Sequence, residues 1–522
     1  MHRLVIALVA LIGLVGAAVV AGYLLLFSTG TDRAAALAPA RTAVYVNVYL
    51  QPSTGQQVNL AELIGRLPGF ADEASLDEKV DQVVQNLLSG SGIDYRADVK
   101  PWLGDQVSIA AWPGADDPTQ VEAVLIAQVR DREAAKASAG NLVGAEGATF
   151  TSETYQGVEL MVTDGGAYAF VDQMLVIGGT AENLRAVVDV QGGAESLAAR
   201  ADFRAAVDDL PPDHLASAFV DVAGIAAAGG ATDEVAGVST ASAVLVAEPS
   251  GLRISGSAPV DGTAPAPSGA SVPQSEPATL ADWMPADTIA GATFFGVRQL
   301  FEQAEASLGS APGGEDIATA LSTLRAVAAF GLGISIDDDV LPLLEGEVGI
   351  ALGGIGEGGL PSGQLLLRPD DASAAQDLLD GLADRLTAAG AVVETETAAG
   401  TEIVTVEVPE TGSASYAVLD GVVILGLAAD DVRAALEAQA TGETLGASST
   451  YAAAFEPIGG RAGSELYVDV RALVDLLEGG LELSDDERDI LSRIGTFAMT
   501  IPSRPDQIAF HAALTVIEPS AE

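Results

Sequence analysis

Residues 98–103 read Asp-Val-Lys-Pro-Trp-Leu and run into Val-Ser-Ile-Ala at 107–110. The same order returns as Asp-Val-Leu-Pro-Leu-Leu at 339–344, followed by Val-Gly-Ile-Ala at 348–351. A turn that leads into an apolar strand therefore occurs twice in the chain. Self-similarity of this kind indicates an internal duplication.

Two further stretches repeat at a constant offset of 248 residues. Residues 168–172 (Tyr-Ala-Phe-Val-Asp) return as 416–420 (Tyr-Ala-Val-Leu-Asp), and 219–222 (Phe-Val-Asp-Val) return as 467–470 (Tyr-Val-Asp-Val). We interpret the repeated positions as structural signatures and not as a site. They are Pro101, Leu103, Asp172, Asp221, Pro342, Leu344, Asp420 and Asp469.

Composition excludes several classes of protein. The 522 residues carry a formal net charge of −49, yet 49% are hydrophobic, so the chain is not disordered. Such an acidic surface repels nucleic acid and anionic lipid headgroups, and it either keeps the protein soluble or gathers Ca²⁺ or a cationic partner. There is no cysteine, which removes disulfides, thiol catalysis and cysteine metal sites.

The N-terminus predicts a membrane anchor. Leu4 to Phe27 is 24 residues without a charge, and a helix of that length is about 36 Å long, enough to span a bilayer. His2 and Arg3 precede it, so the N-terminus is expected in the cytoplasm and the bulk of the chain outside. The alternative is a signal peptide cleaved near Ala36-Leu37-Ala38.

The expected fold is α+β, with two similar domains of meandering, mostly antiparallel sheets and packed helices. Alternation predicts a strand at 44–49, and apolar spacing predicts a helix at 76–88 with a counterpart at about 301–328. The predicted organisation is 1–37 anchor (span 4–27) and stalk, 38–260 first repeat domain, 261–280 Pro/Ser/Ala-rich linker and 281–517 second repeat domain.

The membrane anchor, the Pro39-Ala40-Arg41-Thr42 strand start and the stretch Gly-Ile-Asp-Tyr-Arg-Ala-Asp-Val-Lys-Pro-Trp-Leu-Gly-Asp at 92–105 resemble a known family. It is the bacterial envelope family catalogued as domain of unknown function 3352. The resemblance covers most of residues 38–517 and implies an exported, single-pass protein of actinobacterial type. The family carries no established activity, so it supplies no catalytic residue.

A search for catalytic patterns finds no metalloprotease, hydrolase, acyl-transferase or P-loop motif. The Gly-Ile-Gly-Glu-Gly-Gly run at 354–359 is interpreted as a hairpin, because a strand is expected after it where a dinucleotide fold needs a helix. His214 and His511 are each expected to be structural. The acidic runs 337–339 and 485–487 could hold Ca²⁺, but neither follows the EF-hand pattern. We therefore assign no catalytic, cofactor-binding or metal residues.

The sequence favours a non-catalytic, membrane-tethered binding or scaffold protein of the cell envelope. Its partner would be an envelope protein or an apolar ligand, and Gly13, Ala17 and Ala21 would permit a weak dimer through the anchor. The alternatives are a carrier for a lipid or other apolar ligand and, less favoured, a carboxylate-based hydrolase. A binding module should expose an apolar patch, a carrier should enclose a cavity, and a hydrolase should hold two carboxylates about 5–10 Å apart in a cleft.

Overall fold

The computed structural model describes residues 27–28, 32–51, 53–67, 81, 84–85, 93–115, 117, 120–143, 149–208, 210–211, 213–228, 238–260, 277–308, 314–355, 361–409, 412–477, 485–504 and 507–517. The predicted span Leu4–Phe27 lies outside these residues except for Phe27, which belongs to a short strand. The chain divides at residue 264 into two compact units. We call them the N-terminal unit (described residues up to 260) and the C-terminal unit (described residues from 277).

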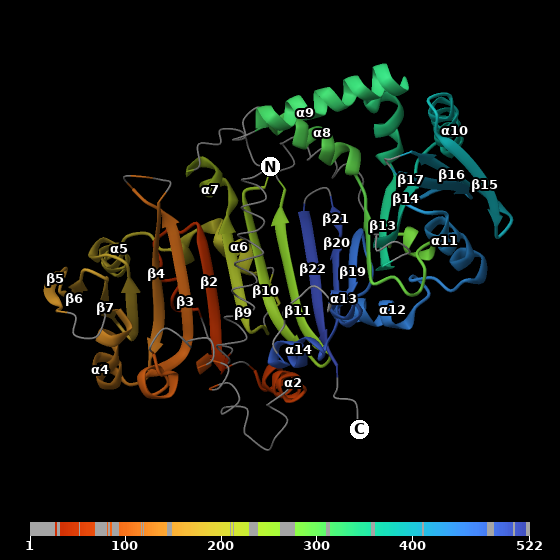
Figure 1. Cartoon of the computed structure of the whole chain (residues 1–522). Helices are drawn as coiled ribbons and strands as arrows, with labels where there is room; N and C mark the ends of the chain where they lie inside the picture. Colours follow the sequence, from red (N-terminus) through yellow and green to blue (C-terminus); the bar gives the residue numbers. More distant parts are fainter. Residues whose placement is uncertain are drawn as a thin grey trace. The chain divides into compact units, whose positions relative to one another are not determined.

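The N-terminal unit is built on an antiparallel sheet (Figure 1). Its order is β5-β6-β7-β8-β4-β3-β2-β9-β10-β11, and β1 adds a short parallel pairing at the end of β2. The strands are β1 Phe27–Ser28, β2 Val44–Gln51, β3 Leu103–Pro113, β4 Val121–Val129, β5 Thr151–Tyr155, β6 Val158–Thr163, β7 Gly166–Val171, β8 Met174–Gly178, β9 Ala216–Asp221, β10 Thr240–Glu248 and β11 Gly251–Pro259.

The C-terminal unit has a sheet of the same strand order. It runs β15-β16-β17-β18-β14-β13-β12-β19-β20-β22, again antiparallel, with β21 pairing to β22. The strands are β12 Ala290–Phe294, β13 Glu347–Ile355, β14 Pro361–Arg368, β15 Val392–Ala398, β16 Thr401–Val408, β17 Gly412–Leu419, β18 Val422–Gly426, β19 Ser464–Asp469, β20 Ile494–Ile501, β21 Ser503–Arg504 and β22 Gln507–Val516.

Helices follow the same strands in both units. The N-terminal unit has α2 Thr54–Gly65, the π-helical turn η1 Tyr95–Val99, α4 Arg132–Val143, α5 Ala181–Gln191, η2 Leu197–Ala199, α6 Ala201–Asp208 and α7 Val222–Ala228. The C-terminal unit has η3 Leu280–Asp282, α8 Val297–Leu308, α9 Gly314–Val327, η4 Ala328–Leu332, η5 Ile336–Val340, η6 Leu341–Leu344, α10 Ala372–Ala388, α11 Ala429–Thr441, α12 Ser449–Phe455, η8 Glu456–Ile458, α13 Val470–Leu477 and α14 Asp485–Leu491. The α+β class is therefore confirmed.

The single helix predicted at about 301–328 is wrong, because the structure has two helices there, α8 and α9. The sequence between them reads Gly-Ser-Ala-Pro-Gly at 309–313. Proline lacks an amide donor and glycine is a poor helix former, so continuation of α8 is disfavoured at this point.

Each unit has its own hydrophobic core, and equivalent aromatic pairs lie in them. Phe203 and Phe219 meet edge to face in the N-terminal unit, with ring centroids 5.1 Å apart. Tyr451 and Tyr467 meet in the same way in the C-terminal unit, also at 5.1 Å. Phe203 comes from α6 and Phe219 from β9, and the equivalent Tyr451 and Tyr467 come from α12 and β19. These rings join the helical layer to the sheet.

The segment before the first strand of each unit is packed, which corrects the predicted stalk and the end of the predicted linker. Ala34, Ala35 and Ala38 are fully buried, so the folded N-terminal unit includes residues placed in the stalk by the 1–37 boundary. Ala278 and Leu280 are likewise buried, although the predicted linker extended to 280. The rest of that linker, 261–276, lies outside the described residues. From composition alone these segments were expected to be loose connections. Their small alanine side chains instead allow the backbone to approach the core closely.

Candidate functional site

The repeated aspartates Asp98 and Asp339 close the π-helical turns η1 and η5. The Asp98 carboxylate accepts from the Asp94 backbone amide at 2.9 Å, and Asp339 accepts from the Ser335 amide at 2.7 Å. Asp94 and Ser335 in turn accept from amides inside their own turns. This reciprocal capping satisfies amides that a helix start leaves unpaired. The most distinctive repeated motif therefore has a structural role.

The other repeated aspartates also shape the backbone. Asp172 and Asp420 have positive φ angles of 53° and 47° in the β7–β8 and β17–β18 hairpins, a conformation that aspartate tolerates better than most residues. Asp221 accepts from the amide of Gly224, and Asp469 accepts from that of Ala472, at the starts of α7 and α13. Each of these aspartates therefore shapes a local turn or helix start.

Trp102 and the described histidines are held in structural surroundings. Trp102 is buried and donates its indole N–H to the carbonyl of Asp98 at 2.6 Å. His214 shares a short hydrogen bond between Nδ1 and the carbonyl of Pro211 and lies edge-on to Tyr49. Burial lowers the pKa of the His214 imidazole, which favours its neutral form. His511 lies in β22 beside Thr500 of β20.

A buried polar cluster fixes the leading segment of the N-terminal unit. Asp32 Oδ1 accepts from the Tyr45 hydroxyl at 2.7 Å, from Gln106 Nε2 at 2.6 Å and from the amides of Ala34 and Ala35. Gln106 and Tyr45 come from the neighbouring strands β3 and β2. Burial raises the pKa of the Asp32 carboxyl, and the hydrogen bonds it accepts oppose that shift.

Two buried glutamates do the same work in the C-terminal unit. Glu347 accepts from the amides of Thr279 and Leu280 at 2.8 and 2.7 Å and from the Thr279 hydroxyl at 2.6 Å. Glu465 accepts from Tyr451, from Arg461 Nε at 2.9 Å and from the amide of Ala278. Sequence reasoning missed both, because carboxylates are numerous in this chain. The available signal was a glutamate directly before the repeated strand 348–351.

An exposed apolar face lies on α9 and the π-helical turn that follows it, at the top of Figure 1. Ile317, Leu324 and Val327 have spacings of seven and three residues, which place them along one side of the helix. They are 43, 56 and 59% exposed, and Phe330 in η4 is 93% exposed. We call these four side chains the α9 surface. They match the exposed apolar patch that a binding module should have.

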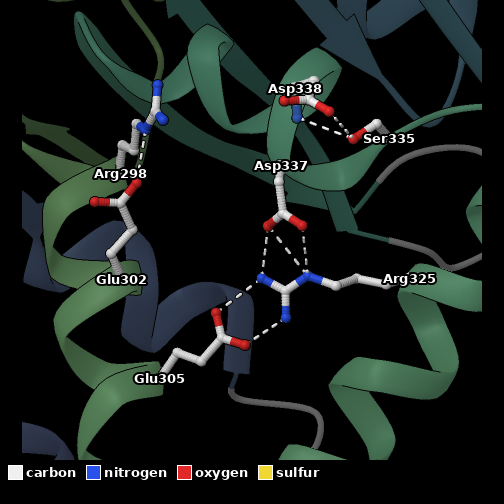
Figure 2. A network of polar contacts seen from close by, with 7 residues as sticks. All are labelled: Arg298, Glu302, Glu305, Arg325, Ser335, Asp337 and Asp338. Carbon is white, nitrogen blue, oxygen red and sulfur yellow. Dashed lines mark hydrogen bonds and ion pairs between the residues drawn. The ribbon is translucent and has the colours of Figure 1, made fainter.

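Arg325 of α9 is turned toward the rest of the unit. Figure 2 shows Arg325 between Glu305 of α8 and Asp337 of η5. Its guanidinium donates to Glu305 Oε2 at 2.8 Å and to Asp337 Oδ1 at 2.7 Å. Hydrogen bonding to Arg325 lowers the pKa of the Glu305 carboxyl. Asp338, next to Asp337, accepts from Ser335.

The network joins the two helices and the acidic turn, so 337–339 is engaged in side-chain and backbone contacts. Arg298 of α8 forms two further ion pairs. One is with Glu302 of the same helix (Figure 2), and the other, with Glu345, ties α8 to the residue that follows η6. The other acidic run, 485–487, begins α14, and its side chains lie outside the described set.

Within the part of the chain that the structure describes, no single helix is long and apolar enough to cross a membrane. Two consecutive segments, Asp316–Leu332 and Ile336–Leu344, are together long and apolar enough for a span, but the chain bends by 87° between them. This pair contains most of α9 and the whole α9 surface.

The fold and its contacts define an α+β protein made of two antiparallel-sheet units, with polar residues that fasten the sheets and an apolar helix face in the second unit. The chain belongs to the family described as Protein of unknown function (DUF3352), whose sequence profile matches residues 4–513. The expected family is therefore confirmed.

Other comparisons add little. No curated protein gives a significant match. Among solved structures, crystal form I of TP0453 matches with 13% identity over 44% of this chain and 79% of that chain, at a TM-score of 0.23. Crystal form IV of TP0453 matches with 11% identity over 44% of this chain and 81% of that chain, at a TM-score of 0.25. At such TM-scores the likeness carries no argument.

Proposed function

We propose that this chain is a non-catalytic binding or scaffold protein, tethered outside the cytoplasmic membrane by its N-terminal apolar segment. The α9 surface is the face that it presents to a partner. The observation that carries the proposal is the exposure of Leu324, Val327 and Phe330 on a chain of net charge −49. Exposing several large apolar side chains together costs solvation free energy, and such patches mark interaction sites.

We further propose that the two units descend from one duplicated ancestor. Their sheets have the same strand order, and their leading segments make equivalent backbone bonds. Leu197 donates to the carbonyl of Ala38 in one unit, and Leu445 donates to that of Met284 in the other, both at 2.8 Å. The proposed binding role belongs to the C-terminal unit, which carries the α9 surface.

The absence of cysteine makes a direct test possible, because any introduced thiol is the only one in the chain. We would place Phe330→Cys and, as a control, Val392→Cys in β15, whose native side chain is 51% exposed. The full-length chain is kept in its native membranes and treated with a water-soluble maleimide. Each labelling rate is divided by the rate of the same variant in denaturant.

If a partner covers the α9 surface, residue 330 should be protected at least several-fold more than residue 392, although it is the more exposed of the two in the structure. Equal rates at the two positions would overturn the proposed binding face. Loss of protection at 330 on adding Leu324→Gln would show that the cover depends on the apolar contact.

A further inference from the structure

From the chemistry of the α9 surface we infer that its occupant is the interface of a zwitterionic phospholipid bilayer, into which α9 and η4 insert their apolar side. This inference rests on the proposed function and names the partner. The helix would lie along the membrane and not cross it.

From Ile317 to Leu332 the segment offers few hydrogen-bonding groups to a protein partner. Arg325 is the only charged residue from Ile317 to Leu332, and two carboxylates already bind its guanidinium. The hydroxyls of Ser322 and Thr323 both donate to the carbonyl of Thr319 at 2.8 Å. Protein interfaces usually contain about one hydrogen bond per 100–200 Å². An apolar face with few free polar groups beside it suits hydrocarbon better.

The length and the bend of the segment favour a position in the membrane surface. Asp316–Leu332 is long and apolar enough for a membrane span only when it is taken together with Ile336–Leu344, and the chain turns by 87° between them. A helix of that first length is about 25 Å long, which is shorter than a bilayer core of roughly 30 Å. Glu315 and Asp316 precede the apolar stretch and Asp337–Asp339 follow it, so charged residues mark both of its ends.

The charge of the chain disfavours two other occupants of the α9 surface, a second copy of the chain and an anionic lipid surface. A second copy of the chain would bring another −49 charges to the interface, and anionic lipid would be repelled in the same way. Surface helices that bind anionic membranes carry Lys and Arg on their polar face. Here the one arginine is neutralised, so the contact depends on apolar burial with an uncharged lipid surface.

The test uses the full-length chain reconstituted in phosphatidylcholine vesicles. Phe330→Cys and Val392→Cys are each labelled with an environment-sensitive fluorophore, and a lipid-attached quencher is added to the bilayer. Quenching at 330 should exceed that at 392 by about twofold or more, since an interfacial helix buries its apolar side at the boundary of the acyl chains. The excess should persist at high salt and decrease when anionic lipid is included.

Adding Leu324→Gln and Val327→Gln to the 330 label removes two apolar side chains without touching Arg325, and it should bring quenching down to the level of 392. Quenching at 330 equal to that at 392 in the unmodified α9 overturns the bilayer inference. If residue 330 is then still protected in native membranes, the occupant is a protein, and the proposed binding role stands without the lipid. If it is unprotected there as well, both proposals fail.

Discussion

Gln106 and Glu347 occupy the same place in the two units, directly before the repeated strands 107–110 and 348–351. Both are buried, and both bind the segment that leads into the first strand. In the N-terminal unit the carboxylate is on the segment, at Asp32, and the sheet supplies donors. In the C-terminal unit the carboxylate is on the sheet, and the segment supplies backbone amides.

A second set of polar contacts shows the same exchange, in which the carboxylate lies on opposite sides in the two units. We call each such set of contacts a joint. In the N-terminal unit the buried carboxylate Asp81 binds Arg96 of η1 and Lys100. In the C-terminal unit the cation is on the helix, at Arg325, and Asp337 of η5 supplies the acid. The comparison teaches that the fold requires a satisfied polar contact at each of these joints and does not require one particular sign of charge.

The largest expected loss of stability comes from placing a carboxylate on both sides of one joint, on the leading segment and on the sheet. Gln106→Glu would replace the amide that donates to Asp32 and Asn47 with an acceptor beside two acceptors. We expect the N-terminal unit to lose about 3–5 kcal/mol of stability at neutral pH, because a buried charge is left without a partner. Hydrogen exchange in β2 and β3, compared with β12 and β13, would measure the loss unit by unit.

Glu347→Gln is the matched control for that variant, since it removes a charge and retains an oxygen that can accept from the amides of Thr279 and Leu280. Its cost should be about 1–2 kcal/mol. The two losses should also respond differently to acid, which protonates the crowded carboxylates of the first variant and restores part of its stability. Equal costs in both units would contradict the interpretation.

The next effect concerns the cation that binds Glu465 in the C-terminal unit. Glu465 is 3% exposed and binds Arg461, whereas the equivalent residue in the N-terminal unit is Ser217. Arg461→Gln should destabilise the C-terminal unit by about 3 kcal/mol, because a buried carboxylate loses its counter-charge. Unfolding free energies from a double-mutant cycle with Glu465→Gln would measure the coupling.

In that cycle the double variant should recover most of the stability that Arg461→Gln loses. If Glu465→Gln added its own full cost instead, the pair would be acting through separate contacts. The ring of Tyr451, which lies 5.0 Å from the Arg461 guanidinium carbon, is the third member of this joint and stays unchanged in every variant.

A smaller effect is expected at the joint under α9. Arg325 is 26% exposed, and partly exposed ion pairs contribute about 1 kcal/mol or less. Arg325→Gln should therefore cost about that amount, and high salt should reduce the difference from the parent chain. Hydrogen exchange of α9 at low and high salt would test this expectation. A cost of several kcal/mol would show that the network of Figure 2 supports more than its own helices.

Much of the fold could be predicted, because local pattern decides it. The strands expected at 44–49 and 107–110 are found within β2 and β3, because alternating apolar side chains bury one face of a sheet. The packed segments 32–38 and 278–280 could not be predicted. The alanine-rich stretch 34–38 looks like a stalk and 261–280 looks like a linker, and the burial of their packed parts depends on partners such as Gln106 and Glu347 far along the chain.

The sequence suggested what kind of surface a binding protein should have and did not indicate where it would lie. An exposed apolar patch was expected of a binding protein, but the spacing of Ile317, Leu324 and Val327 is the same for a buried helix face. Only the tertiary structure shows that the side bearing Arg325 is turned inward and the apolar side outward. The capping bonds of the repeated aspartates could not be read from spacing alone.

The smallest expected effect is that of Asp32→Asn, and its pH dependence matters more than its size. All four donors at this joint reach the same oxygen, Oδ1, which asparagine retains. Burial raises the folded-state pKa of Asp32 above its ordinary value of 3.8, so folding disfavours the ionised form. The variant should therefore lie within about 1 kcal/mol of the parent at neutral pH, on the stable side.

The sign follows from the raised pKa. The stability that Asp32 contributes is fully present below pH 3.8 and is lost as the pH rises through the higher folded-state pKa. The advantage of asparagine should accordingly be greatest at neutral pH and should vanish on acidification, which unfolding free energies of the two chains across this range would show. If the parent instead gained on the variant as the pH rose, the ionised carboxylate would be the favoured form in the fold. The N-terminal joint would then be held by charge, as the C-terminal joint is at Glu465.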